Sequence, residues 1–579
     1  MSGRPQCSSC RIPVFQPSIL SHLTQKAELH KLVRSNKCPT DVQASHCQEI
    51  ISSSPAELER YDTEISRLRA IIDKLEKDRN VVEEYQLLCR YTVSPIRRMP
   101  AEILTEIFAF FVPDAFDPLD TSMQYQEQVQ GELARVANAD LLRIAQVCPR
   151  WHKLAMETPS LWSSIGLHLK LWRDVRSRGR MVTVLESSLV RGGNFPLDLG
   201  INIRGLSGPN ALWLIPLLTQ YSRRWRALSL SMDLATASHY EPTSFGMLST
   251  IQGRLPLLET LQLNMQHLPE TIVEGVASYF AVAPRLKRIQ YYGRLAAFSK
   301  LPLKQLELFA YFDVRPQDLN GLISTMSRFS KAKCDCQIRV SAADGDFLPA
   351  IDLPPVISNV AVLQLCGTRI FEPSQAQSML TEFITRLTLP SLVTLQIVYH
   401  GDQWFPLTWP HREFLALAHR SSFHVHLKQL SLVSVHITEA ELLEALSGLP
   451  VLQHLAISDH RCLDERGEEV VLVTNSLLER LTWTTQFTCL VPDLSFLETH
   501  TLLQFEDSVY RDLVLSRLKP GRNAEGPFEV NLWWYEEYYR EVDPVLVAQF
   551  TELRLQGELL FLINESYAFP TWHYDLPSL

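Results

Sequence analysis

Apolar residues recur at alternating spacings of three and four from residue 58 onward. Such spacing puts one apolar stripe along a helix, in the manner of a heptad seam, with charged residues between its members. We predict an amphipathic, coiled-coil-like helix over 41–92, which either lies on the rest of the molecule or associates with another copy. Residues 1–40 lack a sustained period and are expected to form a poorly ordered tail with one short helix near 20–33. The seam residues are Leu58, Tyr61, Ile65, Leu68, Ile72 and Leu75.

A second helical pattern begins at Pro100. Ile103, Leu104, Ile107, Phe108 and Phe111 share one face, and Pro113 is expected to end the helix. The polar interval 113–138 looks inserted. Another helix is predicted from an N-cap at Asp140, and a third from Pro149 to Pro159.

From about residue 180 the pattern changes to a loose repeat, apolar-x-x-apolar-x-apolar. The last two apolar residues lie two apart and would share one side of a strand, and the intervening segments suit covering helices. Where neighbouring motifs are clear, as at 258 and 286 or 427 and 452, their spacing matches a leucine-rich repeat, which is about 20–29 residues long. An ordinary α/β domain with leucine-rich strands remains the alternative. The motifs begin at Leu258, Leu286, Leu303, Leu392, Leu427 and Leu452, and less strictly at Trp225, Val360, Leu478 and Phe550.

Composition narrows the functional classes. The chain of 579 residues carries a formal charge of -9, which disfavours a nucleic-acid partner because phosphate contacts need a basic surface. No run of 18 apolar residues predicts a membrane span, and the N-terminus lacks the apolar core of a secretory signal, so we expect an intracellular protein, cytoplasmic or nuclear. Its eleven cysteines are then expected to be thiols.

No catalytic motif is present: the sequence lacks the common phosphate-binding, dinucleotide, zinc-protease and serine-hydrolase patterns. We therefore expect no enzyme activity, no cofactor and no metal. His424 and His426 would share a face on a strand, but they lack a third metal ligand. The CxxC at Cys7 is expected to be structural and not to bind zinc. Cys334 and Cys336 are predicted on one face of a strand. The aromatic run 533–540 is predicted to be a capping helix, with an exposed binding patch as the alternative.

Two motifs carry a family resemblance. Pro-x-Glu-Ile-Leu-x-Glu-Ile-Phe at 100–108 and Val-Cys-Pro-Arg-Trp at 147–151, followed by Ser-Leu-Trp at 160–162, resemble the F-box. With the preceding helix, the arrangement is similar to F-box proteins numerous in mushroom-forming fungi. The resemblance implies an α/β chain with four parts: a tail over 1–40, the helix over 41–92, an F-box-like domain over 93–165 and a degenerate leucine-rich-repeat solenoid over 180–579.

The resemblance also implies a function. F-box helices dock on a Skp-family adaptor and so join a cullin-RING ubiquitin ligase, while the repeats would capture an unidentified target protein. The chain has Met99 where leucine usually precedes the proline. A scaffold that works independently of a ligase is the alternative. By resemblance the docking and packing face comprises Met99, Pro100, Ile103, Leu104, Ile107, Val147, Cys148 and Trp151.

Overall fold

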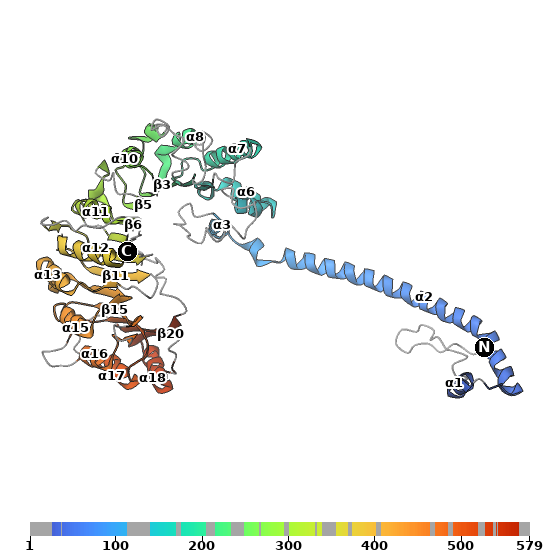
Figure 1. Cartoon of the computed structure of the whole chain (residues 1–579). Helices are drawn as coiled ribbons and strands as arrows, with labels where there is room; N and C mark the ends of the chain where they lie inside the picture. The colour runs from blue at the N-terminus through green and yellow to red at the C-terminus, as the bar shows by residue number, and fades with distance from the viewer. Residues whose placement is uncertain are drawn as a thin grey trace. The chain divides into compact units, whose positions relative to one another are not determined.

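The computed structural model contains a long helix, several short helices and a strand-rich repeat region, so the chain is α/β (Figure 1). It divides into two compact units, residues 1–104 and 105–579, with the boundary inside α3 (Ala101–Ala109). The described residues are 26–35, 37–112, 139–168, 175–203, 215–232, 248–265, 268–293, 300–330, 333–338, 355–368, 373–400, 407–463, 469–483, 490–518, 527–535, 540 and 542–566. The expected insertion at 113–138 and positions 1–25 of the expected tail lie outside them.

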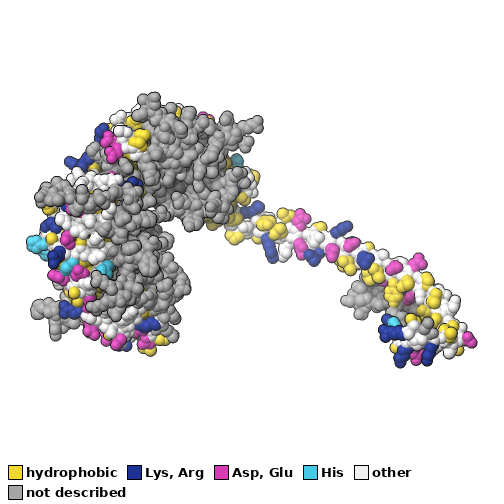
Figure 2. Space-filling model, viewed as in Figure 1, with side chains coloured by type: hydrophobic (Ala, Val, Ile, Leu, Met, Phe, Trp, Pro, Cys, Tyr) yellow, Lys and Arg dark blue, Asp and Glu magenta, His cyan; other side chains and the backbone are white. Residues whose placement is uncertain are grey.

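The first unit contains α1 (Lys26–Ser35), α2 (Asp41–Thr92) and the short helix η2 (Pro95–Arg98). A capping box starts α2: the Thr40 hydroxyl accepts from the Gln43 N–H, and the Gln43 side chain accepts from the Thr40 N–H. The helix predicted over 41–92 is therefore present. Its apolar seam is exposed, and Figure 2 shows hydrophobic side chains recurring between charged ones along α2.

The second unit is built on one parallel sheet. Fourteen strands of the described residues pair in chain order, each beside its neighbours in sequence. The strands are β1 (Ser164–His168), β2 (Leu197–Asn202), β3 (Trp225–Ser231), β4 (Thr260–Met265), β5 (Arg288–Gly293), β6 (Leu308–Val314), β7 (Lys333–Ile338), β9 (Val362–Thr368), β11 (Thr394–His400), β13 (Gln429–Val433), β15 (His454–Ser458), β18 (Phe496–Thr501), β19 (Phe528–Tyr535) and β20 (Leu559–Ser566).

Helices alternate with these strands and pack on one side of the sheet (Figure 1). Such alternation suits a parallel sheet, because a parallel connection must return the chain to the same end. The helices are α7 (Val175–Arg191), α8 (Ile215–Thr219), α10 (Glu270–Ser278), α11 (Leu319–Met326), α12 (Pro373–Arg386), α13 (His411–Ser421), α14 (Phe423–His426), α15 (Glu439–Ser447), α16 (Asn475–Leu481), α17 (Asp507–Arg517) and α18 (Pro544–Leu555). Three short two-stranded ladders lie outside the main sheet: β8 (Val356–Ile357) with β10 (Leu387–Thr388), β12 (Leu407–Thr408) with β14 (Val435–His436), and β16 (His460–Leu463) with β17 (Glu469–Val470).

The core is a set of rows that cross the strands. One row joins a register-matched residue from every strand, all buried except Phe561 at the last strand, which is partly buried. Its members are unevenly spaced along the chain, since the step from Leu455 to Leu497 is about twice the step from Ile289 to Phe309. The members are Ile165, Leu199, Leu228, Leu261, Ile289, Phe309, Cys334, Leu363, Leu395, Leu430, Leu455, Leu497, Val530 and Phe561.

Strands predicted from seven of the repeat motifs are confirmed as β3, β4, β5, β9, β11, β13 and β15. Cys334 and Cys336 also lie on a strand, β7, two residues apart as predicted. The prediction for the motif at Leu303 was shifted by three residues. In register with Ile289 and Tyr291, β6 places Phe309 and Tyr311 in the core, so aromatic residues occupy positions where leucine was sought.

Three other predictions, for two repeat motifs and for the aromatic run, were wrong. The motifs at Leu478 and Phe550 lie in α16 and α18, since residues three apart share a helix face as well as a strand entry. Trp533 and Trp534 lie on strand β19, not on a capping helix, because they pair in parallel with β18 and β20. His424 and His426 lie in α14, a single helical turn, and are exposed.

Arginine side chains form hydrogen bonds between successive strand-helix repeats of the second unit. Three of them donate to backbone carbonyls at the end of the preceding unit's helix: Arg224 to Leu189, Arg420 to Thr385, and Arg517 to Leu481. Carbonyls at a helix C-terminus have no partner within the helix and carry negative partial charge, so a planar guanidinium satisfies them well. The device recurs at sequence separations of 35 to 36 residues.

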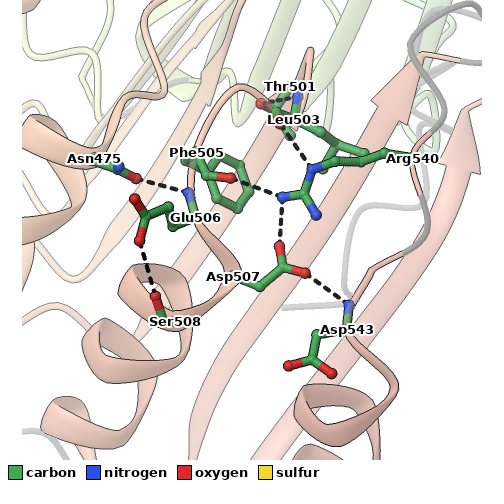
Figure 3. Close-up of polar contacts among 9 residues, drawn as sticks. All are labelled: Asn475, Thr501, Leu503, Phe505, Glu506, Asp507, Ser508, Arg540 and Asp543. Carbon is green, nitrogen blue, oxygen red and sulfur yellow. Dashed lines mark hydrogen bonds and ion pairs between the residues drawn. The ribbon is translucent and has the colours of Figure 1, made fainter.

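Arg540 makes a related connection at the C-terminal end (Figure 3). It donates to the carbonyls of Leu503 and Phe505, at 3.0 and 2.9 Å, and pairs with Asp507. Asp507 also accepts from the Asp543 N–H at 2.7 Å. Burial alone would raise the pKa of Asp507, but these donors lower it below its ordinary value.

Candidate functional site

The N-terminal part of the predicted docking face lies around the start of α3. Pro100 precedes the helix and its carbonyl accepts the Leu104 N–H at 3.2 Å. Leu104 is fully buried, whereas the adjacent Ile103 is 46% exposed. Met99 and Ile107 are half-buried. The pattern therefore separates a packing residue, Leu104, from a surface residue, Ile103, on the same turn.

The C-terminal part lies where α5 (Ala139–Ala145) and α6 (Pro149–Glu157) meet. Cys148 is the N-cap of α6: its thiol accepts from the Trp151 N–H at 3.5 Å, and Pro149 occupies the first helical position. Val147, just before this cap, is 61% exposed. Asp140, expected as the N-cap of α5, lies inside the helix instead.

Trp151 packs on Phe108, which ends the motif at 100–108 but is not among the eight predicted docking residues. Its ring meets Phe108 edge to face, with centroids 5.1 Å apart, and Phe108 is fully buried. The helical periodicity of 100–111 already contained Phe108, so the sequence held the signal. Phe110 and Phe111 follow the end of α3 directly, and both are exposed. Large exposed apolar residues suit a surface that another protein covers.

The eight predicted residues thus differ in environment. Leu104 is buried, Pro100, Ile103 and Val147 are exposed, and Met99, Ile107, Cys148 and Trp151 are half-buried. Phe108, which is buried, and Phe110, which is exposed, were not among these eight residues.

Trp162 links the end of this helical region to the sheet. It is buried, its Nε1 donates to the Ala155 carbonyl at 2.7 Å, and the Arg191 guanidinium lies 4.7 Å from its ring centroid. It also precedes Ile165 and Leu167, the first core residues of the sheet, with the spacing that Trp225 has in β3. One residue therefore completes the helical motif and begins the first repeat.

A second candidate surface is the sheet face opposite the core rows. On β18 this face carries Glu498 and His500, both buried, with His500 Nε2 2.8 Å from Glu498 Oε1. The His500 ring stacks on Trp533 of β19, with centroids 6.0 Å apart. Burial, and secondarily the charge of Glu498, raises the pKa of Glu529 on the next strand. His500 Nδ1 and Trp533 Nε1 are buried without a hydrogen-bond partner.

Neither surface has the chemistry of a metal site. Within the described ranges, no group of three or more His, Cys, Asp or Glu side chains could hold a metal ion. Nor does any helix of those ranges combine the length and apolarity needed to cross a bilayer.

Comparisons with known proteins concern the segment that contains the first surface. Residues 96–168 match the family model described as F-box-like. No curated protein matches the chain. Thirty-two chains of solved structures match, including one from "Crystal structure of Rad7 and Elc1 complex in yeast", at 12% identity and a TM-score of 0.25, covering 68% of this chain and 98% of that one. The F-box-like identity therefore rests on the family match, and the segment that carries it is residues 96–168.

Proposed function

We propose that this protein is a substrate-receptor subunit of a Skp/cullin/F-box ubiquitin ligase, of the type numerous in mushroom-forming fungi. The observation that carries the proposal is the F-box-like match over 96–168 together with the exposed apolar residues within it. Helices this short cannot bury both faces among themselves, and apolar surface that stays exposed suits an interface. The receptor is intracellular and has no catalytic residue, cofactor, nucleic-acid partner or membrane partner of its own.

In this role the predicted residues have two tasks, adaptor contact and helix packing. Met99, Pro100, Ile103, Ile107 and Val147 contact the Skp-family adaptor, while Leu104, Cys148 and Trp151 hold the helices in place. The F-box-like domain occupies about 93–165 behind the helix 41–92, and the remainder to 579 is a degenerate leucine-rich-repeat domain that captures the target protein. The core row that crosses every described strand of the sheet supports this repeat assignment.

Calorimetric titration of the full chain with a Skp-family adaptor tests the docking. We expect Ile103→Asp and Val147→Asp each to weaken binding at least ~10-fold, since a charge placed at a covered apolar contact costs well over about 1.4 kcal/mol. Val190→Asp is the matched control, because Val190 is 71% exposed on α7, outside the F-box-like segment, and should leave binding unchanged. Equal affinities for all three variants would contradict the adaptor role and favour a ligase-independent scaffold.

Target capture needs a separate measurement. We infer that the target binds the sheet face opposite the core, where the half-buried Trp533 of β19 lies with its ring stacked on His500. The test compares wild type with Trp533→Phe. It identifies the proteins that accumulate on each form of the receptor under proteasome inhibition. We expect loss of specific targets from the variant with adaptor binding intact. Unchanged recovery would remove this face from the proposal.

A further inference from the structure

The apolar stripe of α2 is uncovered in a helix of 52 residues. Apart from the half-buried Tyr61, its large members are exposed, by 42% at Ile65 to 67% at Val82. Figure 2 shows these hydrophobic side chains at the surface of the helix. A single helix with such a stripe leaves much apolar surface in water, so its stability favours a partner with a matching stripe.

The residue types along the stripe indicate which kind of partner helix fits it. In heptad notation the a positions hold Leu58, Ile65 and Ile72, and the d positions hold Tyr61, Leu68 and Leu75, spaced by seven in each case. β-Branched residues at a with leucine at d favour parallel two-stranded coiled coils. We propose that α2 pairs with α2 of a second copy of this chain as a parallel, in-register coiled coil. The inference is independent of the proposed ligase function.

One charge pair beside the centre of the stripe favours this orientation, and two others oppose it. Parallel pairing brings Glu64, at a g position, beside Arg69, at the following e position of the second copy, and each copy contributes one such pair. Arg79 at an a position lies between the like charges Asp78 and Glu83, and it already pairs with Glu83 at 3.2 Å. At the other end, parallel pairing would bring Glu57, which is buried and already pairs with Arg60, near Asp62 of the second copy. The unfavourable contacts therefore flank the Ile-Leu centre of the seam and limit the affinity.

A cysteine provides a reporter of the geometry. Cys89 is exposed and falls on a d position, two heptads after Leu75. In a parallel in-register pair the two Cys89 residues of a layer face one another, within the Cα separation that a disulfide spans. In an antiparallel pair, d positions face a positions, so the two Cys89 residues lie far apart.

The first experiment measures mass. Sedimentation equilibrium of the full chain, 66.2 kDa, should give about twice that mass at micromolar concentration. Leu68→Glu/Leu75→Glu should restore the monomer, whereas Ala70→Glu/Asn80→Glu adds the same charge off the seam and should remain dimeric. Circular dichroism confirms that both variants keep their helix content. A monomeric wild type, or equal masses for the two variants, would overturn the proposal.

The second experiment maps orientation. Oxidised dithiothreitol accepts the two protons and two electrons released when two Cys89 thiols join, and peptide mapping identifies the disulfide. A Cys89–Cys89 cross-link that disappears in Cys89→Ser supports the parallel register. A dimer without that cross-link would refute it. Adaptor binding should be unchanged in the seam variants, so failure here and failure of the docking proposal remain distinguishable.

Discussion

Replacing Arg517 by methionine should destabilise the C-terminal units selectively. Arg517 is the last residue of α17 and is 1% exposed. Its Nε donates to the Leu481 carbonyl at 3.1 Å, Nη1 to Val491 at 2.8 Å and Nη2 to Leu490 at 3.1 Å. Methionine preserves much of the stem but donates to none of these oxygens.

The magnitude follows from the three acceptors. A buried carbonyl left without a donor costs about 1–3 kcal/mol, which gives a gross loss of several kcal/mol. Removing the buried charge recovers part of this loss, because a desolvated guanidinium is itself costly. We expect a net destabilisation of about 3 kcal/mol, comparable to breaking a buried ion pair. Arg517→Lys should lie between wild type and Arg517→Met, since an ammonium cannot reach three acceptors in one plane.

The assay must report the stability of individual repeats, because a stacked repeat array does not unfold in a single two-state transition. Hydrogen exchange followed by mass spectrometry should show peptides of α16 and α17 exchanging about 100-fold faster in Arg517→Met, with peptides of β1 to β4 unchanged. Arg511→Met is the control: Arg511 lies on the same helix but pairs with Asp512 nearer the surface, and we expect about 0.5 kcal/mol or less. Equal exchange in the two variants, or loss spread evenly over the sheet, would refute the role assigned to Arg517.

Three further predictions concern other units. Trp162→Ala should destabilise α6 and β1 by about 3–5 kcal/mol, measured by exchange of peptides over 149–168, whereas Trp162→Phe should cost less and mainly reflect the hydrogen bond to Ala155. Gly293→Ala should destabilise β5 by more than about 1 kcal/mol in the same measurement, because φ is 138° and a Cβ would lie 2.8 Å from the Met265 carbonyl; a neutral effect would contradict the close approach. Because the pKa of folded Asp507 is lowered, its ionisation stabilises the fold above the unfolded pKa, and that contribution is lost as pH falls through the lower folded value. The difference in urea midpoint between wild type and Arg540→Met should therefore be larger at pH 7 than at pH 3, and a constant difference would argue against the Asp507 pair.

The sequence predicted the repeat region where leucine or valine occupies the core. Leu395 and Leu430 were found because the triplet around each is regular and its side chains point inward from a strand. In β18 the register position after Leu497 is Thr499, whose hydroxyl lies 3.4 Å from the buried Tyr510 hydroxyl, so an apolar search missed that strand. A search for apolar periodicity cannot find a buried polar side chain whose hydrogen-bond partner is distant in the sequence.

The candidate docking residues were predictable as a set but not in their environments. Both Ile103 and Leu104 lie on the apolar side of one helical turn, and only the packing of the whole region buries one and leaves the other exposed. The arginine contacts between units were not predictable at all. Arg420 and Arg517 resemble any basic residue in the last turn of a helix until stacking brings the preceding unit's carbonyls within reach.

Trp162 belongs both to the helical region and to the first repeat, and this limits where a gene fusion can join the two regions. A gene fusion that joins a foreign F-box-like segment at residue 163 would leave β1 without the indole that caps its first layer. A fusion after residue 168 would instead remove β1 from the sheet and expose the edge of β2 to unwanted pairing. Exchange of repeat arrays between proteins of this architecture is therefore expected to succeed only when the junction lies upstream of Pro149, so that α6, Trp162 and the first strand stay together.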